Sequence, residues 1–176
     1  MDLRKLIIGY LIGFSLFVVL IPYLLVSAAQ NPDLWLSGPI FSNTVLRLAV
    51  SLPLFLIGVL FAIWSNVFLL DKGKGGPVDA FNVSISPRTK FLVTTGPYRY
   101  CRHPMVFGTI CLYSSISLYL NSMHDLIVVL MVIPFFVLFL KYSEEKRLIR
   151  DFGNVYLEYK RNVPMIIPFT KLKPKK

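Results

Sequence analysis

Apolar residues gather in four runs along the chain, and the charged residues lie between the runs. The first two runs extend from Leu6 to Val26 and from Val45 to Leu70, and two shorter runs cover Met105 to Leu120 and Leu126 to Leu140. An apolar stretch of about 20 residues is long enough to cross the hydrocarbon core of a bilayer as a helix. The pattern predicts one all-α integral membrane domain over residues 1–176, with about four transmembrane helices.

The first run has two interpretations. It follows Arg4 and Lys5, so a cleaved signal peptide, which is also basic and then apolar, is an alternative to a retained span. The run is longer than the apolar core of a signal peptide, which favours a span, with Pro22 as a kink near its outer end. Residues 1–70 are then two N-terminal spans.

The third and fourth runs are short for membrane spans. The third run, 105–120, would reach only about 24 Å as a helix, whereas the hydrocarbon core is about 30 Å thick. Either both helices extend at their ends or the pair forms a re-entrant hairpin. Residues 143–161 then predict an amphipathic surface helix within a catalytic region at 105–168. Its apolar face would consist of Leu148, Phe152, Val155, Tyr156 and Tyr159.

The net charge of +10 comes from 19 Lys and Arg against 9 Asp and Glu. These cations flank the apolar runs and form no patch with interleaved aromatics, so nucleic-acid binding is not expected. The N-terminus, the loop 71–104 and the stretch 141–176 hold 2, 6 and 10 of them, and the last is Arg47. The segments 27–44 and 121–125 hold none. The positive-inside bias therefore predicts a cytoplasmic loop and both termini on the cytoplasmic side of the cell membrane.

Candidate chemistry lies on that face. Arg102 and His103 directly precede Pro104, which suits the first position of a helix. Exposed backbone N–H groups at a helix start, together with these cations, favour an anion such as a ligand carboxylate. The alternative is that the basic residues anchor to lipid headgroups.

Adjacent acids at the membrane edge are a second candidate feature. Glu144 and Glu145 could bind an ammonium group or stabilise a developing cation, or they could simply favour the dipole at the start of the surface helix. The two cysteines, Cys101 and Cys111, are interpreted as unpaired thiols, because a disulfide framework needs more cysteines. No metal site is expected.

Two segments form a joint pattern that covers about residues 90–168. They read Gly96-Pro97-Tyr98-Arg99-x-x-Arg102-His103-Pro104-Met105 and Glu144-Glu145-x-x-Leu148-x-x-x-Phe152-Gly153-x-x-Tyr156-x-x-Tyr159. The pattern resembles the isoprenylcysteine carboxyl methyltransferase and phospholipid methyltransferase superfamily. The glycines at 73, 75 and 76 are similar to the glycine-rich loop of small prokaryotic members.

The resemblance implies an enzyme that uses S-adenosylmethionine to methylate a lipid or lipidated acceptor, through a carboxylate or an amine. Catalytic roles are implied for Glu145 and Arg102. The implied cofactor-binding residues are Val93, Gly96 and Tyr98 along the cofactor, Arg102 and His103 at its carboxylate, and Glu144 and Glu145 at its ammonium or sulfonium. Many relatives carry an aromatic residue where this chain has Val106, with Phe107 one place later.

Two alternatives stay open. Cys101 to Pro104 is also similar to a segment of membrane sterol reductases, which use NADPH, although paired carboxylates suit a sulfonium better than a phosphorylated dinucleotide. A noncatalytic membrane scaffold is the other alternative, and the intact pairs at 102–103 and 144–145 argue against it. The sequence does not indicate an oligomeric state.

Overall fold

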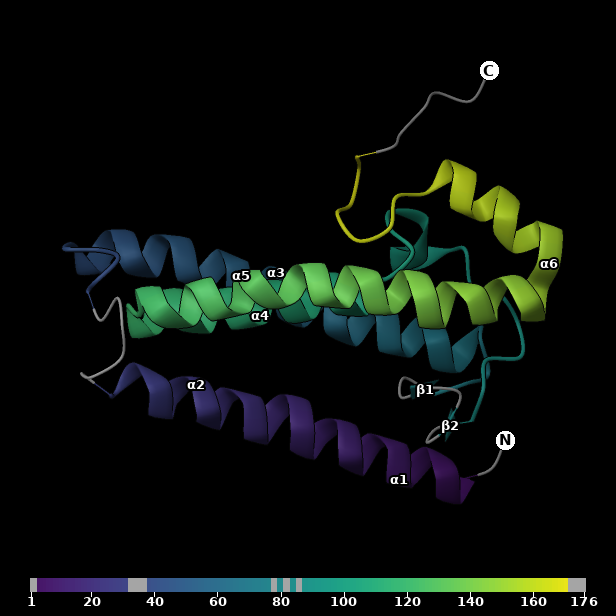
Figure 1. The fold of residues 1–176 in the computed structure, drawn as a ribbon, viewed down its shortest axis with the longest axis horizontal. Coiled ribbons are helices and arrows are strands. Elements are labelled where there is room, and N and C mark those ends of the chain that lie inside the picture. Colours follow the sequence, from purple (N-terminus) through teal and green to yellow (C-terminus); the bar gives the residue numbers. More distant parts are fainter. Residues whose placement is uncertain (1–2, 32–37, 77–78, 81–82, 85–86, 171–176) are drawn as a thin grey trace.

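The computed structural model describes residues 3–31, 38–76, 79–80, 83–84 and 87–170, and it is almost entirely helical (Figure 1). The elements in chain order are α1 (Leu3–Phe14), the π-helical η1 (Ser15–Leu20), α2 (Ile21–Ala29), α3 (Thr44–Asp71), β1 (Asp79–Ala80), β2 (Val83–Ser84), the 3₁₀ turn η2 (Gly96–Arg99), α4 (Pro104–Leu120), α5 (Met123–Phe139), the π-helical η3 (Leu140–Glu144) and α6 (Glu145–Asn162). Asp79 pairs with Ser84, and Ala80 with Val83, in a small antiparallel hairpin.

Three continuous helical stretches are long and apolar enough to cross a membrane: Leu3–Ala29, Thr44–Asp71 and Met123–Asn162. The fourth apolar helix, α4, has 17 residues. The predicted all-α membrane architecture is therefore confirmed. The two short runs differ, because the fourth run extends through η3 into α6 while the third extends by only one residue.

The chain passes back and forth so that its basic segments meet at one end. Figure 1 shows the start of α1, the β1–β2 hairpin and α6 at the same end, opposite the α2–α3 and α4–α5 connections. At that opposite end Asn121, in a left-handed conformation, closes α4. Its side-chain oxygen accepts hydrogen bonds from Ile40 N at 2.9 Å and Phe41 N at 2.8 Å. Ser122 then caps α5 by accepting from Asp125 N.

The tightest helix pair is α3 with α4, and glycines let their backbones approach. A Cβ on Gly108 would lie 2.9 Å from both Ala62 N and Gly58 O. A Cβ on Gly58 would lie 2.8 Å from Leu112 N and 2.9 Å from Gly108 O. Small residues at such crossings maximise van der Waals contact between membrane helices. This contact holds the start of α4, where Arg102 and His103 lie, against α3.

The predicted amphipathic helix at 143–161 is present as α6, Glu145–Asn162, and the structure adds two details to it. The chain enters α6 directly from α5 and η3, with no loop between them. Gly153 then adopts φ 55° and ψ −131° inside α6, a conformation that favours glycine. The second half of α6 therefore folds back, as Figure 1 shows. Of the five predicted apolar residues, Leu148, Phe152, Tyr156 and Tyr159 line one cavity, described below. Val155 is 65% exposed and lies outside that face.

Candidate active site

The segment just before α4 pairs with the chain that follows α6. Arg102 N donates to Pro164 O at 2.9 Å, and His103 N donates to Met165 O at 3.0 Å. This pairing brings the two basic side chains against α6. The backbone amides of Arg102 and His103 are used in this pairing, so an anion near these two residues would have to be bound by their side chains or by the helix start.

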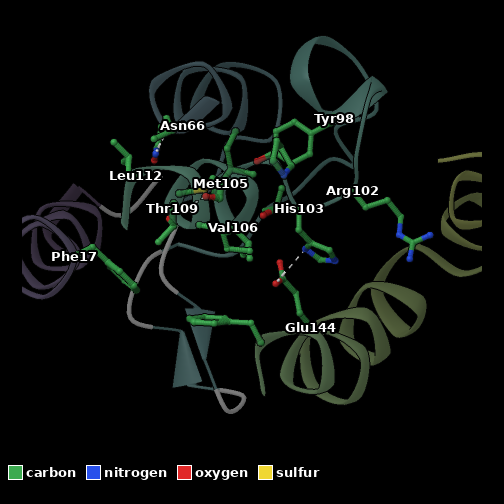
Figure 2. A pocket seen from close by; sticks show the side chains of 18 of the residues that line it. Phe17, Asn66, Tyr98, Arg102, His103, Met105, Val106, Thr109, Leu112 and Glu144 are labelled. Atoms are coloured by element: carbon green, nitrogen blue, oxygen red, sulfur yellow. Dashed lines mark hydrogen bonds and ion pairs between the residues drawn. The ribbon is translucent and has the colours of Figure 1, made fainter. Parts of the chain in front are cut away.

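The guanidinium of Arg102 binds three groups of the α6 region. Its Nη2 forms an ion pair with Glu145 Oε1 at 2.5 Å, and its Nη1 donates to Lys160 O at 2.7 Å and to Val163 O at 2.9 Å. The side chain is 6% exposed. Figure 2 shows it directed toward α6, away from His103 and Glu144. Arg102 therefore fixes the folded-back end of α6.

Glu145 is the buried anion of this cluster. Glu145 is 1% exposed, and its second carboxylate oxygen, Oε2, pairs with Lys160 Nζ at 2.7 Å. A buried carboxylate is tolerated only when it is paired, and removing a partner from a buried pair is costly. Glu145 thus links the start of α6 to both Arg102 and Lys160, and Lys160 reaches it because the helix turns at Gly153.

His103 and Glu144 form a second contact that faces the interior space. His103 Nδ1 lies 3.5 Å from Glu144 Oε2, and Figure 2 shows the two side chains pointing toward each other. His103 Nε2 lies 3.8 Å from Glu145 Oε1, so the imidazole sits between both glutamates. The π-helical η3 ends at Glu144, and such turns occur frequently at functional sites.

Three tyrosines complete the polar end of the site. Tyr159 Oη donates to Tyr98 O at 2.5 Å, and Tyr98 Oη donates to Ser65 O at 3.4 Å. Burial, followed by the charge of Glu144, raises the pKa of the Tyr98 phenol, so Tyr98 stays neutral. Tyr156 is fully buried, and its Oη lies by the Glu145 carboxylate without a hydrogen bond of good geometry to any residue that the structure describes. Tyr156 is therefore a buried polar group for which a ligand could supply the partner.

The remaining predicted residues, Val93 and Gly96, differ in position. Val93 is buried and lines the cavity described below. Gly96 does not line it. Gly96 has φ 61°, and a Cβ there would overlap the ring of Phe68. Its glycine is explained by this turn and by the close approach of Phe68.

A cavity of about 640 Å³ extends from these groups between the apolar helices. His103, Glu144 and Tyr156 line it together with apolar residues of the first span, α3, α4 and α5. Val106 lines the cavity, as Figure 2 shows. Phe107 instead packs its ring on Phe61 of α3, with centroids 4.9 Å apart, so it does not replace the aromatic residue missing at 106.

Comparison with known proteins identifies the family of this chain. Residues 46–155 match the family model for phospholipid methyltransferases. The chain belongs to this family. Its relatives include the Protein-S-isoprenylcysteine O-methyltransferases of Mus musculus and Rattus norvegicus, each 36% identical over 85 residues. The aligned part is 47% of this chain and 29% of each relative. No solved structure matches the chain.

The match to the phospholipid methyltransferase family covers only part of the site. It includes α3, α4, α5 and the first half of α6, and thereby the predicted residues from Val93 to Glu145. It leaves out the first span and Lys160. The structure brings Val93, Tyr98, Arg102, His103 and Glu144 to the cavity, whereas Gly96 and Glu145 do not line it.

Sequence analysis missed Lys160 and the polar contact of the first span with α3. Lys160 lies 15 positions after Glu145, a spacing at which a continuous helix would separate the two side chains by about 22 Å. Gly153 within a charged helical pattern was the one indication that the helix could turn. Tyr10 Oη donates to Asn66 Oδ1 at 3.2 Å, and nothing in either local sequence indicates that pairing.

Proposed function

We propose that this protein transfers a methyl group from S-adenosylmethionine to a lipid or lipidated acceptor, at the end of the bundle that carries α6. The observation that carries the proposal is the cavity, which joins a polar end at His103, Glu144 and Tyr156 to a long apolar wall. A soluble, charged donor and a membrane-borne acceptor need these two environments side by side. By the positive-inside bias this end faces the cytoplasm.

The polar end fits the charges of the donor. S-adenosylmethionine has a carboxylate, an ammonium and a sulfonium. The cavity offers the cations Arg102 and Arg147, the imidazole of His103, the Glu144 carboxylate and the buried Tyr156 phenol. Glu144, whose side chain is 32% exposed, is available to the ammonium or sulfonium, and His103 to the carboxylate. Val93 and Tyr98 line the neighbouring wall.

Arg102 and Glu145 support this site through their own contacts. Their ion pair holds α6 against the start of α4, which sets the positions of His103 and Glu144. We therefore assign both residues a positioning role in the described conformation. Any direct contact with the donor would require Glu145 to exchange Lys160 or Arg102 for the donor ammonium, and Arg102 to release part of its contact with α6.

The chain's own contribution to the reaction is alignment and desolvation. S-adenosylmethionine supplies an activated methyl group on sulfonium. Apolar side chains of Leu148 and Phe152 line the cavity beside the polar end and exclude water from it. A carboxylate acceptor needs only alignment and desolvation, whereas an amine acceptor must also lose a proton, which His103 can accept.

The comparisons support both acceptor classes. The family description names phospholipids, and the two mammalian relatives are named for methylation of isoprenylcysteine. Both kinds of acceptor combine a hydrocarbon chain with a polar reacting group. We therefore propose a lipid-borne acceptor and leave the reacting group as carboxylate or amine.

Calorimetric titration of the detergent-purified protein tests the proposal. We expect saturable binding of S-adenosylmethionine that a His103→Ala, Glu144→Gln double variant abolishes. Arg150→Ala is the matched control, because its exposed side chain lies on α6 away from the cavity, and it should bind as the wild type does. Binding of NADPH without binding of S-adenosylmethionine would overturn the proposal in favour of a reductase.

A further inference from the structure

The first span contributes one wall of the cavity although it lies outside the family match at 46–155. The residues of this wall are Gly9, Tyr10, Gly13, Phe14, Phe17, Val18, Ile21 and Leu25. Positions 9, 13, 17, 21 and 25 recur at every fourth residue, and positions 10, 14 and 18 adjoin them, so the set forms one face of the helical stretch Leu3–Ala29. Two glycines, Gly9 and Gly13, lie one turn apart on this face and leave room beside the bundle.

The wall is long. From Gly9 to Leu25 it extends about 24 Å at 1.5 Å per residue, most of the ~30 Å hydrocarbon core. The opposite wall consists of α4 and α5 residues such as Thr109, Val129 and Phe136. The cavity therefore runs lengthwise between the first span and α4–α5, beginning at His103 and Glu144.

Two hydrogen bonds position the first span across this space. Tyr10 Oη donates to Asn66 Oδ1 at 3.2 Å, and Tyr113 Oη donates to Phe17 O at 2.8 Å. Phe17 lies within the π-helical η1, and Figure 2 shows its side chain beside the cavity residues of α4. These bonds tie the wall to the bundle at two points and leave an apolar space between them.

We propose that this space holds the hydrocarbon chain of the methyl acceptor, and that Gly9, Gly13 and Phe17 set the length and width of the chain that fits. The inference rests on the proposed methyl transfer. Continuity with His103 and Glu144 identifies the occupant, because a chain lying along the first span brings its polar head to the polar end of the cavity. An apolar space of this kind does not hold ordered water, since water needs polar partners.

A larger side chain at Gly13 tests whether the apolar space beside the first span holds the hydrocarbon chain of the acceptor, which we call the chain site. Gly13→Leu projects a side chain into the cavity and raises helix propensity, so the span should still form. Each buried methylene contributes about fourfold to binding. We expect a loss of tenfold or more in kcat/KM for long-chain acceptors and less than a twofold change for short-chain acceptors.

The probes are matched pairs that differ only in the chain: S-farnesyl and S-prenyl N-acetylcysteine, and long- and short-chain phosphatidylethanolamine. Leu11→Phe is the control variant, since Leu11 lies on the same span, is 61% exposed and does not line the cavity. It should leave both chain lengths unchanged. Equal losses for long and short chains in Gly13→Leu, or no loss for either, would overturn the inference.

A second variant and a readout independent of turnover keep the inference separate from the proposed function. Phe17→Ala widens the space and should shift preference toward longer or branched chains. A long-chain lipid bearing a diazirine should photolabel residues 9–25 in the wild type, and Gly13→Leu should reduce that labelling at least fivefold. If this wall is labelled in a protein that binds no S-adenosylmethionine, the result would support the chain site and contradict the proposed methyl transfer. Labelling confined to other helices would reject the chain site.

Discussion

Replacing Glu145 by glutamine removes the buried negative charge that pairs with Arg102 and Lys160. The substitution keeps the size and shape of the side chain. Glu145 and Arg102 have side chains that are 2% and 6% exposed, so the variant leaves Arg102 buried without its countercharge. Removing one partner of a buried pair costs about 3–5 kcal/mol. Because glutamine still accepts one hydrogen bond, we expect the lower end, a loss of about 3 kcal/mol in the free energy of unfolding.

Lys160→Met supplies the matched comparison. The Lys160 side chain is 36% exposed, and Glu145 keeps Arg102 when Lys160 is lost. Solvent screens that pair, so we expect a loss of about 0.5–1 kcal/mol. Both free energies can be measured by denaturant titration in mixed micelles. A cost below about 1 kcal/mol for Glu145→Gln, or equal costs for the two variants, would refute the assignment of Glu145 as the buried countercharge of Arg102.

Two further predictions concern the backbone turn and the buried thiol. Gly153→Ala should destabilise the protein by about 1–3 kcal/mol, because φ 55° and ψ −131° strain any residue with a Cβ although no atom lies within 4 Å of it. Thermal unfolding should show this loss, and a neutral result would contradict the turn at Gly153. Burial raises the pKa of the Cys101 thiol to about 12, so maleimide should modify Cys101 near neutral pH only after unfolding. Rapid modification of Cys101 in the native protein, read by mass spectrometry, would contradict that burial.

Much of the site could be predicted from the sequence because its groups are chemically unusual where they occur. Arg102 and His103 before a helix-starting proline, and Glu144 and Glu145 at the edge of an apolar run, stand out without any structure. The structure brings these two pairs together, with His103 between both glutamates. That Glu144 lines the cavity while Glu145 does not was not predictable, because that depends on the π-helical η3 and on the turn at Gly153.

The sequence by itself determined the membrane architecture. Long apolar runs must form helices in lipid, since every backbone polar group has to be satisfied within its own segment. The basic residues between the runs likewise determined which segments gather at one end. These properties depend on local composition, which can be read without knowledge of what lies opposite each residue.

Only the tertiary structure decided the distant pairings. Lys160 meets Glu145 because one glycine reverses a helix, and Tyr10 meets Asn66 across 56 positions of sequence. The apolar wall of the first span likewise becomes part of a cavity only when it stands beside α4 and α5. Such contacts depend on how helices are placed relative to one another. Helix periodicity specifies which face of a helix is apolar, but it does not specify which neighbour that face will meet.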